Sequence, residues 1–274
     1  MIRSVRWVVA TALVLSVVGQ GCAVGTIGTP NAKGSGLGTQ PRSRPTDGQA
    51  QGPVPTGRDP NRAKADAERM IRAAEEGLAP VYAPLAEEIV ERLSLAPKEG
   101  VGIDLGSGPG TLILELARRT KLHWINADIN PYFFPYFFRK AEQAGLGGRV
   151  GAIQADACAL PFRDDFAEVI VSRGSLQFWP NLRRGIAEVR RVLKPGGVAY
   201  LGRGLPERMP PEVAKNIREG HGQGPKYDPD QTEQQLREIM KSLRIESYRI
   251  HRPRRNNPEG VNYGLWLEFH KAQG

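Results

Sequence analysis

The chain has 274 residues, of which 40% are hydrophobic and 24% charged, so its composition excludes a polytopic membrane protein, a collagen-like fibre and a wholly disordered chain. Its two cysteines are too few for a disulfide-rich secreted scaffold or a cysteine-based zinc site, and we expect no metal centre. The net charge of +9 would suit nucleic acid, anionic lipid or an acidic ligand. Because residues 1–60 hold six basic and two acidic residues, nearly half of this excess lies near the N-terminus, and we expect no nucleic-acid partner.

Residues 1–22 have the pattern of a signal peptide or membrane anchor. Two arginines precede an uncharged apolar run at 7–18, which is shorter than the roughly 20 residues of a membrane-spanning helix and typical of a signal peptide. Cys22 ends the string VVGQGC, which resembles the lipobox of bacterial lipoproteins, although Gly19 stands where an aliphatic residue is usual. The resemblance implies lipidation of Cys22. Plain secretion and an uncleaved anchor stay open as alternatives.

A segment rich in glycine and proline follows this N-terminal pattern. The stretch Gly21–Pro60 holds nine Gly and six Pro in forty residues and shows no apolar periodicity. Such a composition cannot bury enough surface to offset the entropy of ordering, so we predict a disordered tether at 23–59 and a single domain at 60–274. We expect the protein to be membrane-associated, with the membrane surface as a partner of the N-terminus. The side of the membrane stays open.

The predicted elements of the domain alternate between helices and strands. Asp59 and Pro60 suit the cap and first residue of a helix that continues to Gly77, and a second helix is expected at about 84–93. The alternation from residue 101 predicts an α/β fold, a Rossmann-like, mostly parallel sheet of seven strands with helices on both faces. Helices are expected between the first five strands. The last two strands should be joined by a short connection and form an antiparallel edge pair. The predicted strands are 101–105, 122–127, 149–154, 167–172, 197–202, 244–250 and 263–270.

The most informative segment is VGIDLGSGPGTLILELARR, in which a strand ends in a glycine-rich turn and a helix follows. Such a turn lets a ligand approach the backbone and reach the helix N-terminus. The dinucleotide-binding pattern would need glycine at Thr111, and the phosphate-binding loop of nucleotide hydrolases would need Lys followed by Ser or Thr. The remaining pattern is D-x-G-x-G-x-G, with Asp104 as the acidic residue and a helix from Thr111 to about Arg118.

Four further segments follow in a fixed order. Asp128 ends the second strand, 22 residues after Gly106, and the next segments are QADACALPF, FAEVIVSRGSLQFW and RRVLKPGGVAYL. Together the five segments resemble the class I S-adenosylmethionine-dependent methyltransferases, in particular the small-molecule enzymes of quinone biosynthesis. The resemblance covers about residues 80–203 and extends weakly to 270. It implies S-adenosyl-L-methionine as cofactor and methyl transfer to a small acceptor, with lipophilic acceptors among the candidates. The turn at 195–197 is assigned no chemistry.

The resemblance also implies roles for individual residues. The methionine part of the cofactor would lie on Gly106, Ser107, Gly108 and Gly110, with Asp104 near its amino group. Asp128 would hold the ribose hydroxyls, Ile129 would pack on the adenine face, and the adenine edge would meet Asp156 and Ala157. Ser172 and Arg173 would lie near the methionine end, although Asn or His is more usual near Arg173. Solvated strand ends at Asp104 and Asp128, and a helix cap at Asp156, are the structural alternatives.

The acceptor site is less clear in the sequence. Phe178 and Trp179 follow the fourth strand at the end of the sheet where substrates bind in open α/β folds, so they are the candidate acceptor residues. Asn130 and Pro131 suit the cap and the first residue of a helix that holds the aromatic run PYFFPYFF at 131–138. This run would pack in the core or wall an acceptor site, and 205–230 would serve as a lid. A basic cluster at 249–255 would be a solvated face or a contact for anionic lipid or an acidic substrate. No side chain is identifiable as a catalytic base.

Three functions are compatible with these sequence motifs. The first is a methyltransferase that uses S-adenosylmethionine, and the second is a membrane-tethered S-adenosylmethionine-binding or interaction domain without catalysis. The third is a nucleotide-dependent oxidoreductase, which Thr111 disfavours. The glycine turn and Asp128 favour the first function over the second without excluding it.

Overall fold

The computed structural model describes residues 59–220 and 228–273. The predictions for the N-terminal segment 1–22, for Cys22 and for the tether up to residue 58 concern residues outside the described ones. The same holds for 221–227 within the predicted lid; the described part of that segment includes one helix, α6 (Pro211–Gly220). Among the described residues, none of the helices combines the length and the apolarity that a membrane crossing needs.

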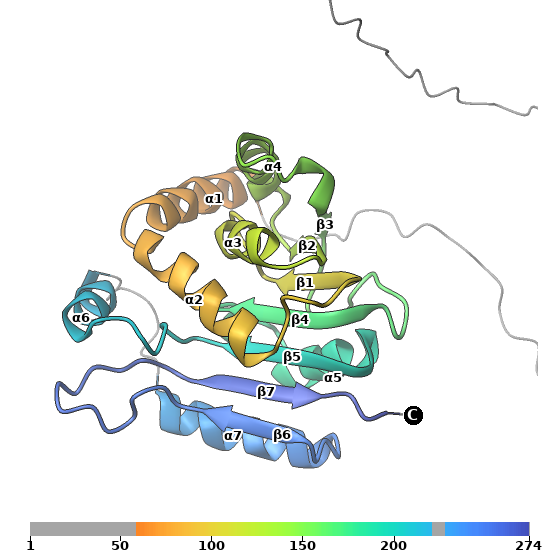
Figure 1. The fold of residues 1–274 in the computed structure, drawn as a ribbon, viewed down its shortest axis with the longest axis vertical. Helices are drawn as coiled ribbons and strands as arrows, with labels where there is room; N and C mark the ends of the chain where they lie inside the picture. Colours follow the sequence, from red (N-terminus) through yellow and green to blue (C-terminus); the bar gives the residue numbers. More distant parts are fainter. Residues whose placement is uncertain (1–58, 221–227, 274) are drawn as a thin grey trace, which may run out of the picture. The chain divides into compact units, whose positions relative to one another are not determined.

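The seven described strands form one sheet in the order β3-β2-β1-β4-β5-β7-β6 (Figure 1). Neighbours among the first five strands are parallel, and β7 pairs antiparallel with both β5 and β6. The predicted mostly parallel sheet with an antiparallel edge pair is therefore confirmed. The strands are β1 (Val101–Leu105), β2 (His123–Asp128), β3 (Val150–Gln154), β4 (Ala167–Arg173), β5 (Leu193–Gly202), β6 (Tyr248–His251) and β7 (Trp266–His270).

Helices cover both faces of the sheet, as the sequence predicts (Figure 1). One apolar cluster packs the first four helices and α6 against one face, and a second cluster packs α5 and α7 against the other. The parallel strands are buried on both faces, which accounts for their continuous runs of Val, Ile and Leu. The remaining helices are α1 (Pro60–Glu75), α2 (Ala79–Arg92), α3 (Thr111–Arg119), α4 (Phe134–Gln143), α5 (Leu182–Val192) and α7 (Pro229–Ser242).

Two predicted helix starts are confirmed by their caps. The side chain of Asp59 accepts a hydrogen bond from the backbone N–H of Asn61, so α1 begins at Pro60. Asn130 accepts in the same way from the N–H of Tyr132, but the turn that it caps is a short 3-10 helix, η1 (Pro131–Phe133), which leads directly into α4. The aromatic run divides between core and surface: Phe133, Tyr136 and Phe137 are buried, and two of its rings are exposed.

Other predicted boundaries are wrong for identifiable reasons. No helix connects β3 to β4; residues 155–166 form turns and a short bridge instead, because the segment holds too few residues for a helix and its two connections. Helix α2 begins at Ala79 rather than near residue 84, with Pro80 in its first turn, where proline is well tolerated, and Pro84 inside the helix. Strand β5 begins at Leu193, and the predicted turn at Gly196 is a bulge inside it, with φ of 76°.

The strand order reverses between β1 and β4. After β1 the chain continues to β2 and β3 on one side, and then crosses to β4 and β5 on the other side. In open α/β sheets such a reversal leaves a crevice at the carboxyl ends of the two strands, because the connecting helices go to opposite faces. The carboxyl ends of β1 and β4 therefore mark the place where a ligand is expected.

Candidate cofactor and acceptor sites

Asp104 lies at the carboxyl end of β1, beside the strand-order reversal, and is 2% exposed. Its Oδ2 accepts a hydrogen bond of 2.8 Å from the Ser107 hydroxyl, whereas its Oδ1 is buried and has no hydrogen-bond partner. The pKa of this carboxyl is raised to about 7, chiefly by burial and also by the charge of Asp128, while the Ser107 hydrogen bond and the charge of Arg173 oppose the shift. A buried acceptor without a partner is costly, so this oxygen is suited to a donor supplied by a ligand.

The glycine-rich turn after β1 has a backbone that other residues cannot adopt easily. Gly106, Gly108 and Gly110 all have positive φ, at 68°, 57° and 77°. A Cβ atom on Gly106 would stand 2.4 Å from the Ser175 Cβ, and one on Gly110 would stand 2.2 Å from the Phe137 ring. A Cβ on Gly108 would meet only the Phe133 ring at 3.8 Å, so the turn packs tightly at its ends and leaves space at its middle.

The turn is tied to the end of β2 through Asp128. The Asp128 carboxylate accepts hydrogen bonds of 2.8 Å from the backbone N–H groups of Gly108 and Asn130. The Asn126 side chain donates a bond of 3.1 Å to the Gly108 carbonyl, and its own Oδ1 is buried without a partner. These contacts join the glycine turn and the Asp128 carboxylate into one buried unit. Asp128 is the residue that the family resemblance assigns to the ribose.

The loop after β3 lies along the same unit. The Ala155 N–H donates to the Asp128 carbonyl at 2.9 Å, which brings Asp156 and Ala157 to the side of the β2 end. The Asp156 carboxylate accepts from the Cys158 N–H at 2.8 Å and thus forms a local turn rather than the cap of a helix. Ile129 is half-buried beside this loop, where Gln154 donates to its carbonyl. The structure therefore brings together the four residues predicted to contact the adenosine part.

Ser172 and Arg173 point to opposite faces of the sheet, because side chains alternate along β4. The Ser172 hydroxyl is fully buried and shares a 2.6 Å hydrogen bond with the Ser175 hydroxyl, which also donates to the Leu105 carbonyl at 3.0 Å. The indole N–H of Trp179 donates to the Ser175 hydroxyl at 3.0 Å. This chain of contacts fixes the segment after β4 against the end of β1.

The Arg173 guanidinium lies on the other face, under α2. It stacks over the Tyr82 ring with 5.5 Å between the guanidinium carbon and the ring centroid, and its Nε is buried without a hydrogen-bond partner. Burial lowers the pKa of this guanidinium, and the nearby charge of Arg203 lowers it further, while Tyr82 and Asp104 oppose the shift. No ion pair within 4 Å joins Arg173 to a carboxylate of the described residues.

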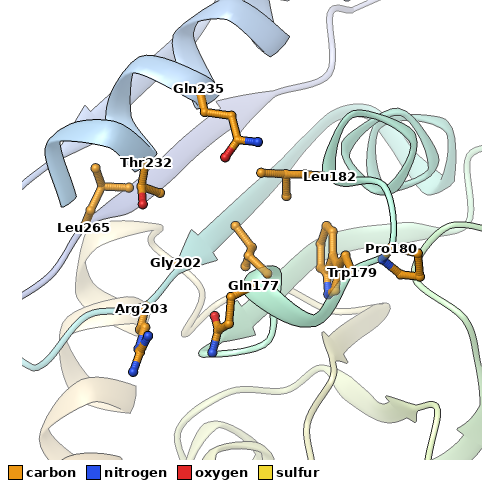
Figure 2. Close-up of a pocket in the computed structure, with 10 residues that line it drawn as sticks. Gln177, Trp179, Pro180, Leu182, Gly202, Arg203, Thr232, Gln235 and Leu265 are labelled. Carbon is orange, nitrogen blue, oxygen red and sulfur yellow. The ribbon is translucent and has the colours of Figure 1, made fainter. Parts of the chain in front are cut away.

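A pocket of about 260 Å³ opens beyond the ends of β4 and β5 (Figure 2). Its wall combines apolar side chains with amides and a hydroxyl from α7, and Arg203 lies at one side. Trp179 lines this pocket, whereas Phe178 is 61% exposed and is not among the lining residues. The pocket is lined by Leu176, Gln177, Trp179, Pro180, Leu182, Gly202, Arg203, Thr232, Gln235 and Leu265.

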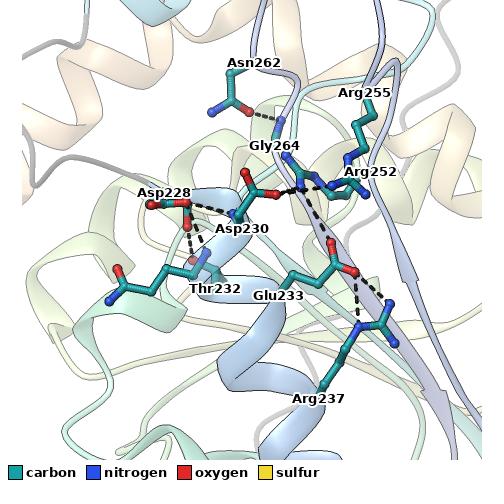
Figure 3. A network of polar contacts seen from close by, with 10 residues as sticks. Asp228, Asp230, Thr232, Glu233, Arg237, Arg252, Arg255, Asn262 and Gly264 are labelled. Carbon is teal, nitrogen blue, oxygen red and sulfur yellow. Dashed lines mark hydrogen bonds and ion pairs between the residues drawn. The ribbon is translucent and has the colours of Figure 1, made fainter.

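The basic cluster at 249–255 is largely paired within the protein. Arg252 forms ion pairs with Asp230 and Glu233 of α7, and Arg255 pairs with Asp230 at 3.4 Å (Figure 3). Arg254 donates to the Tyr263 hydroxyl at 3.0 Å, and His251 contacts Glu207 at 3.2 Å. Arg252 and Arg255 thus hold α7 to the connection between β6 and β7, which has fourteen residues rather than the short length expected.

Several site residues have no counterpart in the sequence predictions. Asn126 is a polar residue inside an apolar strand, a signal that was available in the string HWINAD. Tyr82 and Arg203 carry no local signal, because they lie on α2 and after β5 and reach the site only through the tertiary structure. Gln235 and Thr232 of α7 belong to the same group, since nothing in their helix marks them as pocket residues.

Comparison with known proteins identifies a family for the central part of the chain. A family described as "Methyltransferase domain" matches residues 103–201. The 2-methyl-6-phytyl-1,4-hydroquinone methyltransferase of Arabidopsis thaliana is 33% identical over 117 residues, which is 43% of this chain and 34% of that protein. The ubiquinone/menaquinone biosynthesis C-methyltransferase UbiE of Vibrio vulnificus is 36% identical over 97 residues, 35% of this chain and 37% of that protein. The chain thus matches about a third of the length of these curated relatives.

Solved structures extend the similarity over most of the described residues. A candidate S-adenosyl-L-methionine-dependent methyltransferase of Methanococcus maripaludis has a TM-score of 0.68 at 25% identity, over 77% of this chain and 94% of that one. A geranyl diphosphate methyltransferase solved with S-adenosylmethionine has the same fold, with a TM-score of 0.52 at 14% identity over 69% of this chain and 85% of that one.

The residues at the carboxyl ends of β1 and β2 fit such a cofactor. The buried Asp104 oxygen lacks a donor, the middle of the glycine turn is open, and the Asp128 carboxylate lies beside it. The strand order, the glycine turn and the comparisons therefore agree: residues 103–201 match the methyltransferase-domain family, and the fold is the Rossmann-like fold of S-adenosylmethionine-dependent methyltransferases.

Proposed function

We propose that this protein transfers a methyl group from S-adenosylmethionine to a small lipophilic acceptor of the hydroquinone type. The observation that carries the proposal is the unit formed by Asp104, the glycine turn and Asp128 at the strand-order reversal, next to a pocket at the ends of β4 and β5. The curated relatives are named for hydroquinone, quinone and sterol methylation, which supports a lipophilic acceptor.

The sulfonium of the cofactor supplies an already activated methyl group, which is transferred by in-line displacement. The protein's contribution is therefore to position the two reactants and to exclude water. In this proposal Asp104 and the glycine turn hold the methionine part, and Asp128 holds the ribose. Trp179, Leu176 and Leu182 provide apolar contacts for the acceptor ring. An aromatic carbon is a sufficient nucleophile only when a ring oxygen is ionised or hydrogen-bonded, and Arg203 at the pocket wall is suited to stabilise such an oxygen.

The test uses the full chain, labelled S-adenosylmethionine and three acceptors: a prenylated hydroquinone, a sterol and a water-soluble catechol. We expect label in the hydroquinone, less in the sterol and background in the catechol. A Gly106→Ala variant serves as the control for contaminating activity, because its added methyl group would overlap the Ser175 side chain and displace the turn. Binding of S-adenosyl-L-homocysteine without transfer to any acceptor would favour a non-catalytic binding domain, and absence of binding would overturn the proposal.

We also propose that the N-terminus associates the protein with a membrane, which would bring the pocket near lipophilic acceptors. The support is the apolar run at 7–18 and the lipobox-like string ending at Cys22. Fractionation of cells that express the intact chain or the Cys22→Ala variant, with protease accessibility, tests both the anchoring and its side. Recovery of the intact chain in the soluble fraction would overturn this part and leave the enzymatic proposal untouched.

A further inference from the structure

Two buried polar atoms without partners lie on the two strands that flank the strand-order reversal, and they belong to groups of opposite charge. They are Oδ1 of Asp104 at the end of β1 and Nε of Arg173 at the end of β4. We infer that Arg173 binds the α-carboxylate of S-adenosylmethionine while Asp104 binds its α-ammonium, so that the two side chains select the intact amino-acid end of the cofactor. The inference rests on the proposed function and adds a selectivity that the family resemblance leaves open at Arg173.

The register of the sheet places the two side chains on the same face. Asp104 pairs with Val171 in the parallel β1–β4 ladder, and Arg173 follows two residues later, so its side chain returns to the face of Asp104. The two groups influence each other electrostatically, yet no hydrogen bond or ion pair within 4 Å joins them in the described structure. The amino-acid end of the cofactor has an ammonium and a carboxylate group attached to one carbon atom, which suits a carboxylate and a guanidinium that face one crevice without touching.

Among the described residues, no carboxylate forms an ion pair with Arg173 within 4 Å. Tyr82 of α2 covers the guanidinium with its ring, and Arg203 is a second cation whose charge disfavours the protonated Arg173. Asp104 attracts Arg173 electrostatically only when its carboxyl is ionised, and burial favours the neutral form of that carboxyl. A carboxylate brought by the ligand would offset both the burial of the guanidinium and its repulsion by Arg203.

The position of Arg173 favours the cofactor over the acceptor as the source of this carboxylate. Arg203 and Trp179 line the pocket beyond β4 and β5, but Arg173 and Tyr82 do not. Arg173 instead shares the α2 face with Asp104, whose Oδ2 binds Ser107 of the glycine turn. Arg173 at the end of β4 and Asp104 at the end of β1 thus lie on the two strands next to the glycine turn. The pocket lies on the other side of β4, where Gly202 of β5 lines it.

The test compares three ligands by calorimetry on the full chain. They are S-adenosyl-L-homocysteine, its decarboxylated analogue S-adenosyl-3-thiopropylamine, and 5′-deoxy-5′-methylthioadenosine, which lacks the whole amino-acid end. We expect the unmodified protein to bind S-adenosyl-L-homocysteine about tenfold or more tightly than the decarboxylated analogue, since a charge-assisted contact is lost. In Arg173→Gln this ratio should fall below about threefold, while the affinity for methylthioadenosine stays within about twofold.

Two further variants separate this role from a structural one. Arg173→Lys keeps the charge but not the planar fork, so its ratio should lie between those of the unmodified protein and Arg173→Gln. Arg203→Gln removes the neighbouring cation and should leave the ratio within about threefold of the original, because Arg203 belongs to the pocket. If Arg173→Gln fails to fold, as judged by lost binding of methylthioadenosine, the Lys variant carries the comparison.

The outcomes distinguish this inference from the proposed function. A ratio near one in the unmodified protein, or a ratio that no Arg173 substitution changes, would overturn the carboxylate assignment although the chain still binds the nucleoside. Failure of the unmodified protein to bind any of the three ligands would overturn the proposed function and this inference with it.

Discussion

The carboxylate of Asp128 accepts a hydrogen bond of 2.8 Å from the backbone N–H of Gly108, across twenty residues of sequence. The contact joins the end of β2 to the middle of the glycine turn after β1. Because the same carboxylate also accepts from the Asn130 N–H, it sets both the shape of the turn and the entry into η1 and α4. A residue expected to contact the ribose is thus also part of the structural support of the turn.

We predict that Asp128→Asn lowers both stability and cofactor affinity. An amide offers one acceptor oxygen in place of two, so one of the two backbone N–H groups loses its partner, at a cost of about 1–3 kcal/mol in the free energy of unfolding. Urea denaturation measures this cost, and calorimetry with S-adenosyl-L-homocysteine should show at least a roughly tenfold loss. Asp156→Asn is the control, since its side-chain oxygen can still accept from Cys158 and stability should change by less than about 0.5 kcal/mol. Equal stability losses in the two variants would contradict this account.

The pKa of Asp104 predicts a pH dependence. Because burial raises this pKa to about 7 from 3.8, the folded chain holds a proton that the unfolded chain releases between these values. The free energy of unfolding of the ligand-free protein therefore falls as the pH rises from about 4 to about 7. Above pH 7 the Asp104 carboxylate is ionised and can bind a cationic group of a ligand. Affinity for S-adenosyl-L-homocysteine should rise about fivefold to tenfold from pH 6 to pH 8, as Asp104 ionises.

Asp104→Asn provides the control for this pH dependence. The variant should bind more weakly at pH 8 and show a flat profile, because it has no proton to release. Calorimetry at constant ionic strength between pH 6 and pH 8 measures both curves. A rise of the same size in the variant would assign the titration to another group.

Substitutions in the glycine turn should separate backbone strain from steric collision. Gly106 and Gly174 have similar positive φ values of 68° and 75°, but a Cβ on Gly174 would meet no atom within 4 Å. Gly174→Ala should therefore cost about 1–2 kcal/mol from strain alone. Gly106→Ala should cost at least about 2 kcal/mol more, because its Cβ would overlap Ser175. Urea unfolding of both variants checks the difference, and similar costs would show that Ser175 moves aside freely.

Trp179 and Phe178 should differ in their effect on the acceptor. Trp179 lines the pocket and donates to Ser175, whereas Phe178 is largely exposed. Trp179→Ala should raise the KM for a prenylated hydroquinone about tenfold or more, since a buried aromatic contact is lost, and leave the affinity for S-adenosyl-L-homocysteine within about twofold. Phe178→Ala should change the same KM by less than about threefold. A larger effect at Phe178 would place the acceptor outside this pocket.

The ion pairs between α7 and the β6–β7 connection should contribute unequally to stability. The Arg252 side chain is 14% exposed and contacts Asp230 and Glu233, whereas the Arg255 side chain is 57% exposed (Figure 3). Arg252→Met should lower the free energy of unfolding by about 1–2 kcal/mol, and Arg255→Met by less than about 0.5 kcal/mol. Urea midpoints in low and high salt check both values. Equal effects would mean that neither pair holds α7 in place.

The local features of this protein can be predicted from its amino-acid sequence. Alternating apolar runs and helical periods predicted the parallel sheet, because strands buried on both faces must be apolar along their whole length. The helix caps at Asp59 and Asn130 could be predicted from the sequence, since each depends on a hydrogen bond to a residue only two positions away. The glycine turn could be predicted for a similar reason, because a backbone with positive φ and close packing requires glycine at fixed spacing.

Contacts between side chains far apart in sequence depend on the packing of the whole fold. Tyr82 covers Arg173, which lies 91 residues later in the chain, and Thr232 of α7 lines the same pocket as Trp179. The basic cluster, which the sequence left as a solvated or ligand-binding face, is paired because α7 brings Asp230 and Glu233 to Arg252. That Oδ1 of Asp104 and Nε of Arg173 lack hydrogen-bond partners is likewise invisible in the sequence, since a missing hydrogen bond depends on everything that packs around the atom.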